Sequence, residues 1–91
     1  MKTLCIKAIV SGKVQGVFYR ACTVEKAKAL KLTGWVRNTA DGKVELIACG
    51  EEQNVKALVD WLWQGSKASK VDSVSWEEVV AQSFDDFATK H

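Results

Sequence analysis

Apolar residues recur at every second position near the start of the chain, which is typical of a strand with one buried face. This pattern predicts a strand over Leu4–Val10, and a glycine-bearing loop, Ser11–Val17, follows it. The next residues, Tyr19–Leu32, favour a helix because they are rich in alanine and lysine. One face of this helix carries Tyr19, Thr23, Ala27 and Leu30. Gly34 is expected to stop the helix or to form a turn after it.

The middle of the chain predicts a hairpin and a second helix. Trp35–Asn38 and Lys43–Cys49 have the pattern of strands, and Asp41-Gly42 between them is a strong hairpin signal because both residues tolerate positive φ. Glu51–Gln64 is predicted to be a helix that ends at Gly65. Its apolar residues have the spacing of a buried stripe, which consists of Val55, Leu58, Val59 and Leu62.

The last predicted elements complete a known topology. Val71–Val80 is a further predicted strand, and Phe87–Lys90 is a candidate for a short fifth one. The main elements then follow the order β-α-β-β-α-β. Right-handed crossovers, with the third strand between the first two, give an antiparallel sheet covered on one face by two helices. We therefore predict an α+β, ferredoxin-like sandwich formed by a single domain over residues 1–91. Many unrelated functions use this fold, so it does not identify one.

Composition narrows the classes of protein to which this chain could belong. Its 91 residues are enough for one core, and its net charge of +2 is too weak to indicate a nucleic-acid partner. No apolar run has the length of a membrane span, so we expect a cytoplasmic protein, with a monomer as the simplest state. The three cysteines have no CxxC spacing and His91 is the one imidazole, so we expect no metal site.

The segment with the clearest chemistry lies between the first strand and the first helix. It reads Gly12-Lys13-Val14-Gln15-Gly16-Val17-Phe18-Tyr19-Arg20. Backbone N–H groups at the start of a helix lack partners within it, and with the helix dipole they bind anions. Gly12 and Gly16 allow turns that point such donors inward, and the Arg20 guanidinium matches two phosphoryl oxygens. The alternative is an ordinary turn with a surface arginine, and spacing alone does not decide between them.

A second polar residue is expected near the same place. Asn38 ends the second strand, which runs parallel to the first in a β-α-β crossover, so the carboxyl ends of both strands lie at one edge of the sheet. The side chain of Asn38 could then face the loop after Val10. The alternative is that Asn38 only stabilises the following turn, as asparagine often does before Asp-Gly.

Two long motifs in this chain resemble the signatures of the acylphosphatase family. The first is the loop just described, with one departure, since Tyr19 stands where the family usually has Phe or Met. An aromatic ring can still fill that core position. The second runs through Gly34-Trp35-Val36-Arg37-Asn38 and continues with Gly42, Val44 and Gly50, without a departure. The resemblance covers residues 12–20 and 34–50 and extends more weakly over nearly the whole chain.

The resemblance implies an enzyme that hydrolyses acyl phosphates to a carboxylate and inorganic phosphate, without metal or cofactor. Arg20 and Asn38 would be the catalytic residues, with Asn38 holding the attacking water. The phosphoryl group would bind to Arg20 and to the backbone N–H groups of Gln15, Gly16, Val17, Phe18, Tyr19 and Arg20. No side chain in either motif is an obvious general base, so a substrate oxygen could accept the water proton. The family is generally broad in substrate, and the loop shows no pocket selective for one acyl group.

Cys5 and Cys49 are expected to lie on the outer face of the sheet, on neighbouring antiparallel strands. A disulfide between them is geometrically possible, although a reducing cytoplasm favours free thiols.

Two other functions were compared with acyl phosphate hydrolysis. RNA-recognition domains share the topology and present aromatic rings on the open sheet face. Here the outward positions of the first and third strands carry no aromatic residue, which argues against that function. A domain that has lost its activity, or that serves a larger protein, is disfavoured by the length of the chain and by the presence of both Arg20 and Asn38.

Overall fold

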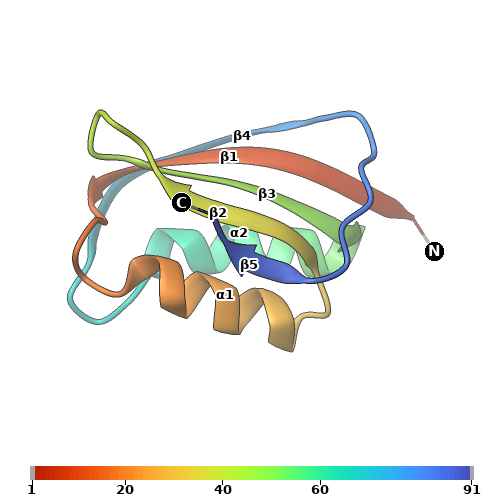
Figure 1. The fold of residues 1–91 in the computed structure, drawn as a ribbon, viewed down its shortest axis with the longest axis horizontal. Coiled ribbons are helices and arrows are strands. Elements are labelled where there is room, and N and C mark those ends of the chain that lie inside the picture. The colour runs from red at the N-terminus through yellow and green to blue at the C-terminus, as the bar shows by residue number, and fades with distance from the viewer. Residues whose placement is uncertain (1, 91) are drawn as a thin grey trace.

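The computed structural model describes residues 2–90, which form one sheet with two helices against it (Figure 1). The helices are α1 (Tyr19–Ala29) and α2 (Glu52–Gln64). The strands are β1 (Thr3–Lys13), β2 (Thr33–Asn38), β3 (Val44–Glu51), β4 (Lys70–Glu78) and β5 (Phe87–Thr89). Both helices lie on the same face of the sheet, as the sequence predicts. The ferredoxin-like fold is therefore confirmed.

The sheet has the strand order β4-β1-β3-β2-β5 and is mixed rather than antiparallel. Neighbours pair antiparallel except β2 and β5, which are parallel. The prediction of an antiparallel sheet is thus correct for four strands and wrong for the fifth. The cause is the route of the chain. β4 finishes at the end of the sheet at which β2 begins. The connection after β4 stays at this end until β5 starts, so β5 runs in the same direction as β2 (Figure 1).

The core lies between the helices and the inner face of the sheet. The stripe predicted for α2 is buried, and so are Tyr19, Thr23 and Ala27 of α1. α1 ends at Ala29, earlier than expected, because Lys31 adopts a left-handed conformation with φ 59° that turns the chain away. Gly34 does not stop the helix. It lies inside β2, where a Cβ atom would come within 1.9 Å of the Ile47 carbonyl oxygen.

β1 is longer than the alternation predicts. It continues through Lys13 because residues 11–13 pair with β4 across a register shift at Ser11 and Gly12. Gly12 therefore belongs to the strand and not to the loop. Its φ of 127° and its close approach to the Lys70 carbonyl oxygen explain why a glycine stands there.

The outer face of the sheet carries an aromatic ring, that of Trp35 in β2. Trp35 is paired with Ile47 and alternates with the buried Val36, so its side chain lies on the face away from the helices. The guanidinium of Arg37 lies 5.9 Å from the centre of its ring, and the Lys90 ammonium lies 4.7 Å from it. The first and third strands still present no aromatic residue there.

An ion-pair network joins three strands on the same outer face. Glu45 of β3 accepts a hydrogen bond of 2.7 Å from Nε of Arg37 in β2, and its other oxygen lies 3.2 Å from Lys7 Nζ in β1. Burial alone would raise the pKa of Glu45, but the hydrogen bonds from Arg37 and Lys7 outweigh it and hold the pKa below the usual value.

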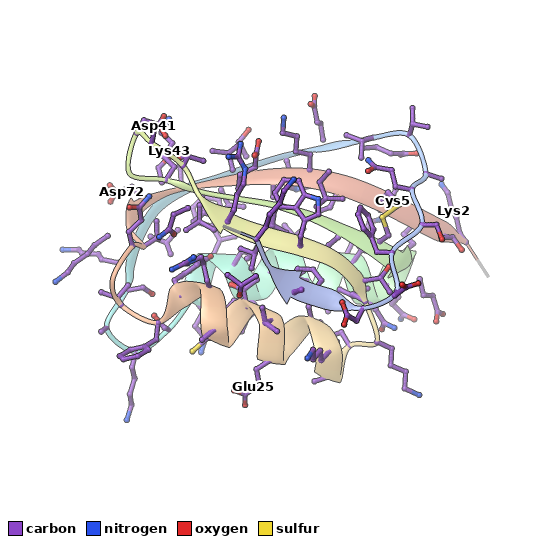
Figure 2. The ribbon with its side chains drawn as sticks, viewed as in Figure 1. Lys2, Cys5, Glu25, Asp41, Lys43 and Asp72 are labelled. Atoms are coloured by element: carbon purple, nitrogen blue, oxygen red, sulfur yellow. A yellow bond between two sulfur atoms is a disulfide. The ribbon has the colours of Figure 1, made fainter. Side chains whose placement is uncertain are left out.

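Cys5 and Cys49 are directly opposed in β1 and β3, as predicted. The structure joins them in a disulfide with their Cα atoms 4.1 Å apart. Figure 2 places Cys5 toward the end of the sheet opposite to Asp41 and Lys43, which mark the tip of the β2–β3 hairpin.

Candidate active site

The loop 14–18 leads from β1 into α1 and is shaped by two left-handed residues. Gly16 has φ 72° with open space around its Cα, and Phe18 has φ 62° and ψ 17°. α1 begins directly afterwards, where the Cys22 N–H donates to the Phe18 carbonyl over 3.0 Å. No side chain caps this end of the helix, and its first turn holds no acidic residue. The amide donors at the start of α1 can therefore meet an external anion without competition from a carboxylate.

Side chains from other parts of the chain hold this loop in place. Gln15 Nε2 donates two hydrogen bonds of 2.9 Å, to the carbonyl oxygens of Thr39 and Lys43 in the β2–β3 hairpin. Ser66 Oγ, just after α2, donates to the Val17 carbonyl over 2.7 Å. Val14 and Val17 are buried in the core beneath the loop. The loop is thus fixed from both the hairpin and the end of α2.

Arg20 lies beside a surface hollow at this loop. The hollow has a volume of about 330 Å³, at the lower end of the range for small-molecule sites. Its walls are formed by Val14, Gly16, Phe18, Tyr19, Arg20, Ala21 and Thr89. Arg20 is half-buried, and none of the described ion pairs includes it. Its charge is therefore available to an anion in the hollow.

Asn38 ends β2 on the same face of the sheet as the loop. It is paired with the buried Val44 and follows Val36 by two residues, so its side chain lies on the helix-covered face. Its Oδ1 atom is the one buried side-chain polar atom within residues 2–90 that has no hydrogen-bond partner. Asn38 is not among the residues that line the hollow, but the adjoining Thr39 carbonyl accepts a hydrogen bond from Gln15 in the loop.

Thr39, and not Asn38, stabilises the hairpin turn. The Thr39 hydroxyl donates to Asp41, and the Lys43 N–H donates to the Thr39 hydroxyl over 3.1 Å. The hydrogen bond that the Thr39 hydroxyl donates to the Asp41 carboxylate lowers the pKa of Asp41, and the charge of the nearby Lys43 lowers it by a smaller amount. The turn role considered for Asn38 is thus taken by its neighbour, and the Asn38 Oδ1 atom makes no hydrogen bond to the turn.

Tyr19, the one departure from the first motif, occupies a core position. Its side chain is buried, and its ring lies 5.8 Å from that of Trp61. Its hydroxyl donates to the Leu62 carbonyl over 2.7 Å, near the end of α2, where carbonyl groups lack helical partners. Burial raises the pKa of Tyr19, so the hydroxyl stays protonated as a donor.

Two residues of the site could not be found from the sequence. Ser66 lies in a short polar connection, and nothing in its surroundings indicates that it reaches Val17. Thr89 lies in β5 and pairs with Val36, which brings it to the hollow beside Arg20. The alternation after the buried Phe87 was the available signal for Thr89, but the parallel pairing that uses it was not predicted.

Within residues 2–90, no group of three or more His, Cys, Asp or Glu side chains is placed to hold a metal ion. His91, the one imidazole considered as a ligand, lies outside the described residues. No helix in the described part of the chain has the length and apolar character needed to cross a membrane.

Known proteins match both the sequence and the fold of this chain. The acylphosphatase family model matches residues 6–89. A relative named acylphosphatase from Coxiella burnetii is 50% identical over 86 residues, which are 94% of this chain and 90% of the relative. A solved acylphosphatase from Coxiella burnetii superposes with a TM-score of 0.94 at 48% identity, covering 97% of this chain and 93% of that one. A solved acylphosphatase from Bacillus subtilis also gives a TM-score of 0.94, at 36% identity, covering 97% and 99%.

This chain belongs to the acylphosphatase family. The resemblance inferred from the two motifs is thereby confirmed, and the protein is a hydrolase of that family.

Proposed function

We propose that this protein hydrolyses acyl phosphates, and that it does so in the hollow beside the loop 14–18. The observation that carries the proposal is the hollow at which the uncapped start of α1 meets the guanidinium of Arg20, which forms no ion pair within residues 2–90. Asn38, whose Oδ1 has no hydrogen-bond partner there, ends β2 next to Thr39, and the Thr39 carbonyl is bonded to Gln15 of the loop. A phosphoryl anion that is bound by these donors and attacked at phosphorus by water fits this combination.

In the proposed complex the phosphoryl oxygens bind to Arg20 and to backbone N–H groups of residues 15–20. The planar fork of Arg20 can donate to two of these oxygens. Gly16 has no atom near the position of a Cβ, so the backbone there can approach an oxygen closely. These donors supply the positive charge that a phosphoryl-transfer transition state needs, and we propose that no metal is required.

Asn38 is proposed to hold the attacking water. Its Oδ1 can accept one hydrogen of the water, which points an oxygen lone pair at phosphorus. The water oxygen then forms a bond to phosphorus, and the bond from phosphorus to the acyl oxygen breaks. The carboxylate leaves with that electron pair, and the water proton passes to a phosphoryl oxygen. Because the carboxylate is a good leaving group, positioning and charge stabilisation carry most of the catalysis.

The first test is hydrolysis of benzoyl phosphate with excess chelator present. We expect the wild type to turn over and Arg20→Ala to lose measurable activity, because the fixed charge of the cradle is gone. The chain offers a matched control in its other arginine, Arg37, which lies on the outer face of the sheet. Arg37→Ala should keep its turnover.

Three results would each overturn a part of this proposal. Failure of folded wild-type protein to hydrolyse the substrate would leave the hollow as an anion-binding site only. Activity that survives in Arg20→Ala would refute the role of the guanidinium. Turnover that requires an added metal ion, and is abolished by the chelator, would refute the metal-independent reaction.

A further inference from the structure

Phe18 stands out from the rest of the loop because its side chain is exposed. It is 79% exposed, whereas its neighbours Val17 and Tyr19 are 7% and 1% exposed. The large apolar side chains that the described residues leave exposed are Phe18, Trp63, Trp76 and Val80. Of these, Phe18 alone lines the hollow that contains Arg20. Burial of this ring contributes nothing to the folded state.

The backbone at Phe18 is also strained. Its φ of 62° and ψ of 17° lie in the left-handed region, which bulky residues rarely adopt because the Cβ atom crowds the backbone. A glycine at this position would relieve the strain, and a polar residue would be better solvated. Folding therefore does not explain the phenyl ring.

We propose that the ring of Phe18 contacts the acyl group of the bound substrate and gives the enzyme a preference for aromatic and other large apolar acyl groups. This inference rests on the proposed function. When the phosphoryl group lies in the cradle and water attacks from the side of Asn38, the acyl oxygen must leave on the opposite side. The acyl group then extends out of the cradle toward solvent, and Phe18 supplies the exposed apolar side chain in the wall of the hollow.

The remaining walls suit an apolar group as well. Val14 and Ala21 line the same hollow, and Thr89 is the one hydroxyl-bearing residue there besides Tyr19, whose hydroxyl is already bonded to Leu62. Apart from Arg20, no charged side chain among residues 2–90 lines it. The sequence by itself suggested no pocket selective for an acyl group. The hollow provides one, with Phe18 as its exposed aromatic surface.

The test compares kcat/KM for benzoyl phosphate and acetyl phosphate in the wild type, Phe18→Ala and Phe18→Tyr. Both substrates present the same phosphoryl group, so any change in the cradle itself affects both, and the ratio reports the acyl contact. We expect the benzoyl preference to fall by about tenfold in Phe18→Ala, the size of one aromatic pair contact. Phe18→Tyr keeps a ring at this position and should keep the preference.

Trp63→Ala is the matched control, since Trp63 is also an exposed aromatic residue but lies on α2 away from the hollow. Its substrate ratio should equal that of the wild type. An unchanged ratio in Phe18→Ala, with both substrates turned over by the wild type, would overturn the inference and leave the proposed function intact. Failure of the wild type to hydrolyse either substrate would overturn the proposed function, and the inference with it.

Discussion

Asn38 is a residue whose side chain destabilises the folded state. A buried oxygen without a hydrogen-bond partner costs about 1–3 kcal/mol, and Asn38 Oδ1 is such an oxygen. The adjacent Thr39 makes all the contacts that the turn requires. A residue that is costly to the fold and unused by the turn is best explained by a ligand, which here is the proposed attacking water.

Asn38→Ala separates these roles. We expect kcat to fall by roughly 10²–10³-fold with little change in KM, by analogy with the removal of one preorganised polar group. The free energy of unfolding, measured in urea, should stay the same or rise, because an unsatisfied oxygen has been removed. Asn54→Ala, on α2, is the matched control and should keep wild-type kinetics. Near-normal turnover in Asn38→Ala would refute the water-orienting role.

At the level of elements, β3 is the strand that organises the sheet. It lies between β1 and β2, and the Glu45 carboxylate connects to cations on both neighbours. β2 approaches β3 so closely at Gly34 that no side chain fits between them. Together these contacts hold β1 and β2 on either side of β3, with their carboxyl ends at the same end of the sheet, where the loop and Asn38 lie.

The close contact at Gly34 predicts a large effect of adding one methyl group. Gly34→Ala should lower the free energy of unfolding by more than about 3 kcal/mol, because the Cβ atom meets backbone and the left-handed φ is unfavourable. Gly42→Ala is the control, since Gly42 also has positive φ but open space around it. It should cost only about 1–2 kcal/mol, the strain term alone. Equal losses in urea denaturation would contradict this packing argument.

The Glu45 network predicts a stability that depends on pH. The folded pKa of Glu45 lies below the ordinary 4.5, so its contribution is fully present above that pH and is lost as the pH falls through the folded pKa. Glu45→Gln should therefore lower the free energy of unfolding at pH 7 by about 1–2 kcal/mol, the value of a charged hydrogen bond. The difference from wild type should shrink as the pH drops below about 4.5. A difference that is the same at acidic and neutral pH would contradict the assignment.

On the scale of the whole molecule, the disulfide and the candidate site lie toward opposite ends of the sheet. The loop 14–18 is tied to the β2–β3 hairpin, whereas the bonded Cys5 lies toward the other end (Figure 2). The disulfide closes a segment in which its cysteines are 44 residues apart in sequence. A change in redox state should therefore affect unfolding more than turnover.

Removal of the disulfide is expected to lower the free energy of unfolding by about 2–4 kcal/mol, because the unfolded chain gains freedom. Urea denaturation with and without reductant measures this effect, and a Cys5→Ala/Cys49→Ala variant, which should not respond to reductant, is the control. Thiol counting on denatured, non-reduced protein should find one free thiol, that of Cys22. A count of three would show that the bond does not form in the purified protein.

The sequence determined the element order, the buried stripe of α2 and the family, because each depends on local pattern or on residues close together in the chain. Alternation placed Cys5 and Cys49 on the outer face, the predicted topology made their strands neighbours, and the glycine motif located the loop that leads to Arg20. The boundaries of the elements depend on more than local pattern. Glycine commonly occurs in turns, so the sequence predicts turns at Gly12 and Gly34, whereas both residues lie in strands that approach another backbone closely.

Only the tertiary structure decided which distant residues complete the site. Ser66 reaches the loop from the end of α2, and Thr89 reaches the hollow through a parallel strand, contacts that no local pattern encodes. The burial of Asn38 without a partner and the exposure of Phe18 likewise depend on everything packed around them. Hydrophobic periodicity indicates which side of an element is buried, but it does not indicate which other element packs against that side. That depends on the packing of the whole chain.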